Sequence, residues 1–579
     1  MNIQILDSWL REHLETKASV KQIAEILSLT SVSVERIEQV GRDYLYDIEV
    51  TTNRPDLMSV VGLAREATVA LRSEGITAKF IEKKHTPPKN VSKPFPIEVI
   101  SHPKLTQRIC AVILSVKLDK SPQVIRDRLE ATDIRSIDNV VDVTNYVMRE
   151  LGHPMHAFDF DKLKTKKMII REAKSGEKIV TLDKKEYTLS GGEIVADNGE
   201  NEIIDLLGIM GTENSAVSEG TRNVLLFVDN NNKHKIRKAS MELGIRTDAA
   251  ILNEKGIDPE LSMVALLRGI ELLQEIAGGK IESTILDIYP KKIETKEISV
   301  SFEKINSVIG VPIPAEKVVD ILQGLNFTVK KTKEGVTVTP PSARFEDIQI
   351  PEDIIEEVAR MYGYHKLSGI LPPTDTVTPL NLAASPFYWE QRAHNALKYW
   401  GFTEVYTYSL VSEDMLEVPT ASAVKIANPL GTDMAYMRTT LIPSLLDTVR
   451  TNKSFETVKI FELANVYYKK ADALPEEISF LSGAVKKDQI SFFEIKGVIE
   501  GLFADLGITK YEFKKTEGGG AGADIFVWGK KVGEIEILER SLIDFEINFT
   551  DLLKYVSMKK TYNPVPKFPA AVEDLRIII

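Results

Sequence analysis

Cysteine and long apolar runs are both scarce in this sequence. Cys110 is the only cysteine among 579 residues, so the chain cannot form an internal disulfide. No segment approaches the roughly 18 uncharged apolar residues that a membrane-spanning helix needs. The opening residues, MNIQILDSWLREHLETK, carry acidic side chains too early for a signal peptide and lack the Arg and Ser bias of a transit peptide. These absences argue against a secreted disulfide scaffold and a membrane protein, and they predict a cytoplasmic location.

An excess of positive charge is also lacking. The chain has 73 Lys and Arg against 84 Asp and Glu, a formal net charge of −11. Affinity for nucleic acid comes from local Lys and Arg and from counterion release, so an RNA contact needs a local basic patch or a partner subunit. The best local candidate is a run of basic residues: Lys233, Lys235, Arg237 and Lys238, with Arg246 further on. A solvated helix face is the alternative interpretation.

What is present is an ordinary globular composition, 43% apolar and 27% charged, over a length that suggests about four domains. Two Pro-rich segments, 83–96 and 367–379, predict linkers. Strand-like alternation and helix-like periodicity are mixed throughout, for example in a helix predicted over 60–73. We therefore expect an α+β multidomain fold. Its expected parts are an N-terminal α/β unit (1–82), a large α+β domain (97–290), a small winged-helix-like domain (296–372) and a long α+β domain (380–555).

The last residues, KFPAAVEDLRIII, end in an apolar β-type run. A lone apolar strand would leave ladder groups unpaired and invite aggregation. We therefore expect either that a final domain has been lost or that the sequence is a fragment.

Acidic side chains gather in the segment ARFEDIQIPEDIIEEVARMYGY. Pro351 suits the first turn of a helix, and acids nearby place negative charge at the positive end of the helix dipole. Asp353, Glu356 and Glu357 stand at i, i+3 and i+4, so they share one helix face, and Asp347 ends the preceding strand. A hard cation such as Mg²⁺ would compensate four converging carboxylates. A Mg²⁺ site and an ordinary acidic helix N-terminus both remain open.

A second polar cluster lies in VVDVTNYVMRELGHPMHAFDFD. It contains Thr144, Asn145, His153, His156 and Asp159. Two His and one Asp suggest zinc, yet no thiolate and no clear further ligand accompany them. A hydrogen-bonding pocket for a polar ligand and a set of satisfied, partly buried polar residues are the other two interpretations.

Several longer strings closely resemble the β subunit of bacterial-type phenylalanine–tRNA ligase. They occur in that family's order and touch every expected domain. They are LYDIEVTTNRPDLMSVVGLARE (45–66), IDNVVDVTNYVMRELGHPMHAFDFDKL (137–163), GIRTDAA (244–250), PEDIIEEVARMYGY (351–364) and NPLGTDMAYMRTTLIPSLL (428–446).

The resemblance implies an α₂β₂ enzyme that activates phenylalanine with ATP and esterifies it to its tRNA, with the active site on the α subunit. A working class II domain should carry an F-R-x-E strand motif and a Gly-rich strand that ends in a catalytic Arg. After Phe461 and Glu462 the chain reads LANVYYKKADA with no Arg, and GEIEILER near Gly533 lacks the glycines. An Arg is needed there because its fixed charge neutralises developing phosphate charge. We expect 380–555 to be a catalytically silent class II antiparallel-sheet domain.

The resemblance also assigns two sites. The family's Mg²⁺ site, shared with the α subunit, matches Asp347, Asp353, Glu356 and Glu357. The family's β subunit edits by hydrolysing tyrosine wrongly attached to the phenylalanine tRNA, in a domain equivalent to 97–290. The editing pocket matches a second set of residues: Thr144, Asn145, His156, Thr247 and Ala249.

Three positions depart from the editing pattern. The acid that receives the tyrosine hydroxyl falls on Phe227, a small residue falls on Leu207, and the second glycine of MGG falls on Thr212. Leu207 is expected to narrow the pocket. Asp229 lies two residues beyond Phe227, so in a strand it faces the same side and is a candidate substitute. Because the discriminating acceptor is lost, we expect weak or absent editing.

Two family modules are missing. Between Gln39 and Asp47 there is no room for the inserted oligonucleotide-binding-fold domain. Residues 561–579 match only the start of the anticodon-binding domain. The alternatives to a ligase subunit are a stand-alone trans-editing hydrolase and a nucleic-acid-binding protein built on the winged-helix-like unit. The silent class II domain argues against the hydrolase, and the acidic helix would repel DNA phosphate. The expected partners are the α subunit and phenylalanine tRNA, with no membrane and no DNA.

Overall fold

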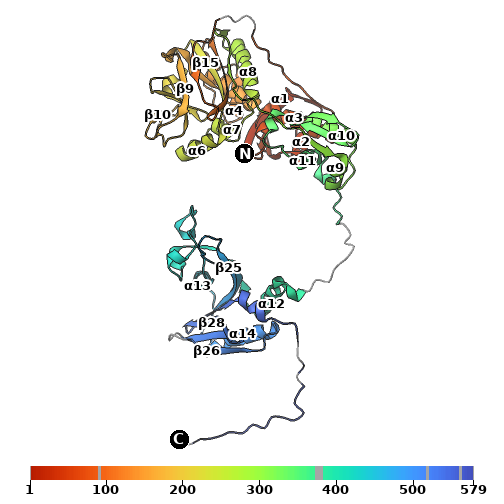
Figure 1. Ribbon diagram of the computed structural model, residues 1–579, viewed down its shortest axis with the longest axis vertical. Coiled ribbons are helices and arrows are strands. Elements are labelled where there is room, and N and C mark those ends of the chain that lie inside the picture. The colour runs from red at the N-terminus through yellow and green to blue at the C-terminus, as the bar shows by residue number, and fades with distance from the viewer. Residues whose placement is uncertain are drawn as a thin grey trace. The chain divides into compact units, whose positions relative to one another are not determined.

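The computed structural model describes residues 2–88, 93–371, 382–516, 521–559, 562 and 564–577. The chain divides into two compact units, Met1–Ile370 and Leu371–Ile579, which are described separately (Figure 1). Among the described residues, no helix combines the length and the apolar character needed to cross a bilayer.

The first segment of unit 1 is a small antiparallel sheet packed against helices. The sheet order is β1-β4-β3, and β3 and β4 form a hairpin that turns at Gly41, so no domain is inserted there. Helix α3 (Val60–Ser73) begins at Ser59, whose side chain accepts the Gly62 N–H, and its bounds confirm the predicted helix. The other elements are α1 (Asp7–Arg11), β1 (Asn2–Leu6), β2 (Leu14–Thr16), α2 (Val20–Thr30), β3 (Ser33–Val40), β4 (Asp43–Glu49), η1 (Pro55–Leu57) and β5 (Ala78–Phe80).

The middle segment of unit 1 contains two larger sheets. One has the order β16-β7-β15-β8 with β17 also paired to β7, and the other has the order β14-β13-β12-β9-β6. The strands are β6 (Glu98–Ile100), β7 (Thr106–Ser115), β8 (His156–Asp159), β9 (Lys167–Glu172), β10 (Lys178–Val180), β11 (Glu186–Thr188), β12 (Ile194–Asp197), β13 (Ile203–Leu206), β14 (Met210–Gly211), β15 (Asn223–Asn231), β16 (Lys280–Ile281) and β17 (Leu286–Ile288). The helices are α4 (Gln123–Ala131), α5 (Asn139–Leu151), η2 (Phe160–Lys162), η3 (Glu213–Ser215), α6 (Lys233–Leu243), α7 (Asp248–Asn253) and α8 (Leu261–Ile276).

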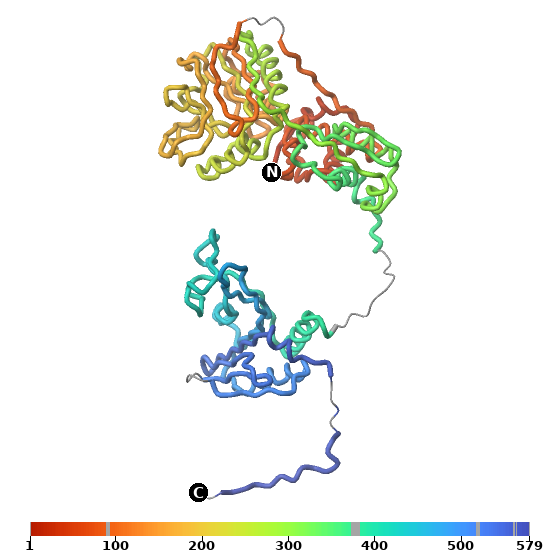
Figure 2. Tube along the Cα trace, viewed as in Figure 1, coloured from red at the N-terminus to blue at the C-terminus, as the bar shows by residue number. Residues whose placement is uncertain are grey.

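The last segment of unit 1 returns to the first. Its three-stranded sheet has the order β18-β20-β19, and its helices α10 and α11 contact α2 and α3. Figure 2 shows this green segment beside the red N-terminal segment. The elements are β18 (Ile298–Ser301), α9 (Phe302–Ile309), α10 (Ala315–Gly324), β19 (Thr328–Lys331), β20 (Gly335–Thr339), η4 (Ser342–Arg344), α11 (Pro351–Tyr362) and η5 (Tyr364–Lys366).

Unit 2 is built on a seven-stranded sheet of order β21-β24-β25-β29-β28-β27-β26, in which all pairs except β21 with β24 are antiparallel. Helices α12 and α14 pack on one face, and α13 packs on the other. The elements are η6 (Leu382–Ala384), α12 (Pro386–Tyr399), β21 (Thr403–Glu404), β22 (Leu410–Val411), η7 (Glu413–Met415), η8 (Thr420–Ser422), η9 (Thr432–Met434), β23 (Tyr436–Met437), α13 (Ile442–Thr451), β24 (Val458–Tyr468), β25 (Glu476–Lys486), α14 (Phe492–Asp505), β26 (Tyr511–Lys515), β27 (Gly522–Val527), β28 (Lys530–Glu539), β29 (Leu542–Asn548), α15 (Phe549–Leu552) and η10 (Leu553–Tyr555).

The two predicted linkers are described only in part, whereas most of the C-terminal run is described. Residues 83–88 and 93–96 contain no helix or strand, in agreement with a linker, and 89–92 lie outside the described residues. Of the second connector, 372–379 also lie outside them. The described residues of 564–577 form no strand, so the β-type run expected there is not seen in that range.

Candidate functional site

Five residues predicted for one pocket do line one pocket in the middle segment of unit 1. The pocket has a volume of about 700 Å³. Thr144 and Asn145 reach it from α5, His156 from the start of β8, and Thr247 and Ala249 from the start of α7. These residues are up to about a hundred positions apart, so the fold creates the pocket.

Local hydrogen bonds fix the two helices that supply these side chains. The Asp138 carboxylate accepts the first free N–H groups of α5, and the helix ends at Gly152 in the left-handed conformation. Thr247 is the N-cap of α7, where its hydroxyl accepts the Ala250 N–H and donates to the Ile209 carbonyl at 2.6 Å. The Thr144 hydroxyl donates to the Val141 carbonyl at 2.7 Å. Both hydroxyls are therefore held in place by the backbone.

His156 is a neutral imidazole with a free ring nitrogen. Burial lowers the pKa of His156 to about 4. Its Nε2 is buried and has no hydrogen-bond partner among the described residues. The ring packs edge-on against Phe158, with centroids 4.3 Å apart. A buried nitrogen without a partner is costly unless a ligand or water supplies one, so His156 is suited to bind a polar group that enters the pocket.

The three departing positions lie in the core of the domain rather than on the pocket wall. Phe227 pairs with His156 in the sheet and packs against Phe158, with centroids 5.9 Å apart. Leu207 and Thr212 are buried, and neither is among the pocket-lining residues. The prediction that Leu207 narrows the pocket is therefore wrong, because its side chain packs into the apolar core of this domain.

Asp229 cannot replace the missing acceptor. The strand alternation is as predicted, but its side chain enters the interior of the domain and does not line the pocket. The Asp229 carboxylate accepts a hydrogen bond from Asn231 at 2.5 Å, and burial raises its pKa to about 6. Burial also raises the pKa of Asp205, and the nearby Asp229 charge adds to this effect.

His153 and Asp159 do not form a metal site with His156. His153 is fully buried, with Nε2 at 2.9 Å from the Ser262 hydroxyl and Nδ1 at 2.8 Å from the Pro154 carbonyl. Asp159 accepts a hydrogen bond from Thr221. Among these three predicted ligands, only His156 lines the pocket. The zinc interpretation is not supported by this arrangement.

Each basic residue of the run on and after α6 has an acidic neighbour. Lys235 lies 2.7 Å from Glu172, Arg246 lies 2.6 Å from Glu254, and Lys233 is paired with Glu346. The two remaining basic residues also have acidic partners: Arg237 with Glu254 and Lys238 with Glu242. These partly exposed, ion-paired side chains favour the alternative interpretation, a solvated helix face.

The four acids around α11 do not converge on one point. Glu357 is buried between Arg344 and Arg360, which donate to its carboxylate at 2.8 and 3.0 Å. Asp353 accepts the Gln349 and Ile350 N–H groups as a helix cap. Glu356 is exposed.

Asp347 accepts hydrogen bonds from Arg344 and Asn53. No group of three or more acidic, His or Cys side chains among the described residues is placed to hold a metal ion. The arrangement does not fit the predicted Mg²⁺ site, because arginines and backbone amides already occupy most of these oxygens.

Glu357 instead belongs to a buried ion network, which consists of Arg54, Glu66, Arg344, Glu357 and Arg360. Arg360 joins Glu357 to Glu66, and Arg54 reaches Glu66 at 3.2 Å. Burial opposes ionisation of Glu357, but Arg360 and Arg344 outweigh it and lower its pKa to about 2. The network therefore joins the first and last segments of unit 1.

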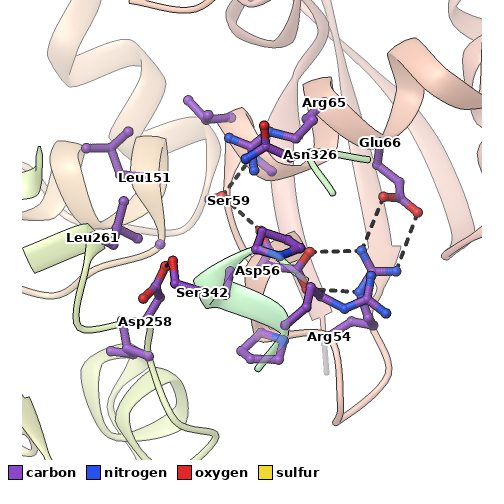
Figure 3. A pocket seen from close by; sticks show the side chains of 18 of the residues that line it. Arg54, Asp56, Ser59, Arg65, Glu66, Leu151, Asp258, Leu261, Asn326 and Ser342 are labelled. Atoms are coloured by element: carbon purple, nitrogen blue, oxygen red, sulfur yellow. Dashed lines mark hydrogen bonds and ion pairs between the residues drawn. The ribbon is translucent and has the colours of Figure 1, made fainter. Parts of the chain in front are cut away.

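A cavity of about 170 Å³ lies beside the network (Figure 3). It is lined by parts of all three segments of unit 1. Figure 3 shows Arg54 extended between Asp56 and Glu66, so its charge is matched within the protein. Ser342 from the last segment donates to Asp258 of the middle segment at 2.6 Å.

Two residues, one beside the pocket and one lining it, were not singled out from the sequence. A Cβ at Gly211 would lie 2.5 Å from His156 Cε1, so only glycine allows the ring to sit there. The MGT string beside the expected MGG was the available signal. Arg135 is exposed at the pocket and has no acidic partner among the described residues. Nothing in its local sequence distinguished it from other surface arginines.

Three family comparisons cover most of the chain. Residues 106–278 match the B3/4 domain, 298–364 match the tRNA synthetase B5 domain, and 379–547 match the phenylalanyl tRNA synthetase beta chain CLM domain. With the mixed sheets and the pocket described above, these matches define the chain as a subunit of an aminoacyl-tRNA ligase.

Curated relatives make the assignment specific. The chain is 34% identical to the phenylalanine–tRNA ligase β subunit of Carboxydothermus hydrogenoformans, over 94% of this chain and 72% of that protein. It is 32% identical to the β subunit of Thermotoga maritima and 33% identical to that of Clostridium acetobutylicum, in each case over 95% of this chain and 72% of the relative. The chain belongs to the phenylalanine–tRNA ligase β subunit family.

Proposed function

We propose that this chain serves as the β subunit of an α₂β₂ phenylalanine–tRNA ligase whose aminoacylation site, with ATP and Mg²⁺, lies on the α subunit. The observation that carries the proposal is whole-chain similarity to β subunits combined with a synthetase-like sheet that lacks a phosphate-binding arginine. We also propose the division into modules at 1–82, 97–290, 296–372 and 380–555. A cytoplasmic location follows from this role.

The interior of unit 2 supports a silent catalytic fold. Glu462 on β24 is buried, and its carboxylate accepts hydrogen bonds from Arg438 at 2.9 Å and Thr407 at 2.6 Å. The strand continues through Leu463 and Ala464 without a cationic side chain. After Glu462 the strand therefore has no arginine that could hold a nucleotide phosphate.

Exposed aromatic side chains at the ends of α12 and α14 support docking of the α subunit, and together they are called the docking surface. Phe387 at the start of α12 is 77% exposed, and Phe493 at the start of α14 is 74% exposed. Tyr399 at the end of α12 is 80% exposed. Large side chains exposed on two packed helices are typical of a surface that a partner covers.

The pocket supports contact with the end of a charged tRNA, together with weak editing. The unpartnered Nε2 of His156 and the exposed Arg135 offer hydrogen bonds and positive charge to a polar, anionic ligand. The resemblance assigns the acceptor of the tyrosine hydroxyl to position 227, where this chain has an apolar phenylalanine that is buried in the core and does not line the pocket. A pocket without that acceptor loses the contact that distinguishes tyrosine from phenylalanine.

Aminoacylation tests the subunit role. The chain is co-expressed with its matching α subunit, and phenylalanylation of tRNA is measured for the mixture and for each chain alone. We expect activity only from the complex. Activity of this chain alone, or full activity of the α subunit alone, would contradict the proposal.

Two variants test the docking surface. F387D/F493D places two charges on the docking surface and should abolish co-purification with the α subunit. M241D, which changes an exposed residue on α6, is the matched control and should leave the complex intact. Retention of the complex by F387D/F493D would exclude this surface.

Deacylation of Tyr-tRNA by the purified complex tests editing. We expect a rate close to that of uncatalysed hydrolysis, and little further change in His156→Ala. A fast rate that His156→Ala abolishes would show that the pocket edits without the acceptor.

A further inference from the structure

One face of the unit 2 sheet carries acids on three adjacent strands. Glu534 of β28 lies directly opposite Glu546 of β29, and Glu536 lies opposite Asp544. Asp524 of β27 lies opposite Glu534. Because side chains alternate along a strand, these five acids share one face, and the intervening apolar residues pack against α12 and α14. They are called the acidic ladder here.

Two lysines lie at one edge of the ladder. Lys531 lies 2.7 Å from both Asp524 and Glu534. Lys514 lies opposite Asp524, and its ammonium is 2.9 Å from Glu512. Neither lysine forms a contact with the central pair of Glu536 and Asp544.

The centre of the ladder is an unsatisfied site. Asp544 is only 4% exposed, and its Oδ2 has no hydrogen-bond partner among the described residues. Glu546 is anchored by the Thr440 and Ser482 hydroxyls and the Leu441 N–H, so it cannot turn away. Like charges placed directly opposite on a sheet are destabilising. A cation that reaches Asp544 would remove this cost.

The four charged groups that most affect Asp544 are all acids. Lys486 of β25 shares the sheet face of Asp544, but its ammonium donates to the Lys453 and Phe455 carbonyls. Burial, followed by the charges of Glu536 and Glu546, raises the pKa of Asp544 to about 7. Glu417, from the loop after η7, and Glu534 add to the effect. Burial raises the pKa of Glu546 as well.

The charge and spacing of the ladder carboxylates limit which kind of ligand can bind. Phosphate-bearing ligands are repelled by this face. A single metal ion needs several oxygens around one point, and the described residues offer no such group. The ladder carboxylates instead form two parallel rows: neighbours within a row are separated by the strand spacing, about 4.8 Å, and the rows lie two residues apart along the strands, about 6.8 Å. A row of ammonium groups on a flexible chain matches this spacing.

We propose that the acidic ladder binds a linear polyamine of the spermidine class, with one ammonium group against Asp544 and Glu536 and the next toward Glu534 and Glu546. The aliphatic spacers lie along the sheet beside the exposed Glu534 and Glu536. Binding replaces repulsion between opposed carboxylates by charge-assisted hydrogen bonds. This site is independent of the proposed ligase role.

Calorimetric titration of the full chain with spermidine tests the proposal. We expect one saturable site and at least a tenfold loss of affinity in E536Q/D544N. That variant removes two repelling charges, so its melting temperature should be no lower than that of the parent. Loss of binding by a variant that is still folded would then be caused by the missing carboxylates. D488N/E500Q changes the net charge equally, away from the ladder, and should bind like the parent.

Three results would overturn the proposal: no binding by the parent, equal affinity in E536Q/D544N, or complete displacement of spermidine by an equal concentration of Mg²⁺. A pH series adds an independent check. Binding should strengthen between about pH 6 and 8 because Asp544 loses its proton in that range, and D544N should weaken this dependence. A pH dependence unchanged in D544N would assign the effect to another group.

Discussion

The buried ion network of unit 1 and the acidic ladder of unit 2 each contain a buried carboxylate, Glu357 and Asp544. The pKa values of these two carboxylates shift in opposite directions. Glu357 is surrounded by arginines and its pKa falls to about 2, whereas Asp544 is surrounded by acids and its pKa rises to about 7. The difference shows that burial alone does not decide the state of a carboxylate. The sign of the neighbouring charges decides whether a buried carboxyl is ionised or protonated.

The two regions also differ in what they hold together. The network joins segments that are 294 residues apart in the chain, as in the contact of Arg360 with Glu66. The ladder lies within consecutive strands that the backbone already pairs. The charged side chains therefore hold distant segments together in the ion network, whereas the paired strands of the ladder do not need theirs.

The largest effect is expected from Glu357→Gln. This change leaves Arg344 and Arg360 buried without their shared counter-charge, which costs about 3–5 kcal/mol of unfolding free energy. Urea unfolding of the full chain, read by hydrogen exchange of peptides from α2 and α11, measures the loss. A loss below about 1 kcal/mol would mean that the network contributes little.

We also expect the stability of the two units to change with pH in opposite directions. For Asp544 the folded-state pKa is raised above the unfolded value of about 3.9, so unit 2 should lose stability as pH rises from about 4 to 7. For Glu357 the folded-state pKa is depressed, so its contribution is present above about pH 4 and is lost as pH falls toward 2. Pulse proteolysis in urea at several pH values, with fragments assigned by mass, separates the units. Parallel pH profiles would contradict the comparison.

A smaller gain is expected from Asp544→Asn. Removing one of two opposed charges should stabilise unit 2 by about 1 kcal/mol at pH 8, with no gain below about pH 5, where the carboxyl is already protonated. The same proteolysis assay measures both values. A destabilised variant at pH 8 would show that the carboxylate has a partner that outweighs the repulsion.

The smallest effect is expected from Glu356→Gln. Its side chain is exposed, so the change should lie within about 0.5 kcal/mol of the parent. Because the neighbouring carboxylates are already paired, adding Mg²⁺ should not raise the melting temperature of either protein. A Mg²⁺-dependent rise that Glu356→Gln removes would restore the predicted metal site.

The sequence predicted local structure better than the partners of charged side chains. Helix 60–73 was predicted at its exact bounds, because its apolar periodicity and its Ser N-cap agree. The acids at 353, 356 and 357 were expected to act as a group. Consecutive residues on a helix point about 100° apart, so Glu356 reaches solvent while Glu357 faces the interior.

The pocket was predicted by resemblance and not by spacing. Thr144 and Thr247 are far apart in the chain, and no local pattern shows that α5 and α7 meet. Strand alternation correctly placed Asp229 on the same side as Phe227, but alternation does not say which side faces a pocket. The acidic ladder was missed because its charges oppose each other only through the pairing register of β28 and β29.

The ion network can be completed only late in synthesis of the chain. Glu66 leaves the ribosome 294 residues ahead of Arg360. At typical translation rates this delay is about 15–60 s. During that interval Glu66 has Arg54 as an ion partner but still lacks Arg360. The N-terminal segment therefore gains its full set of buried ion pairs only after α11 has emerged.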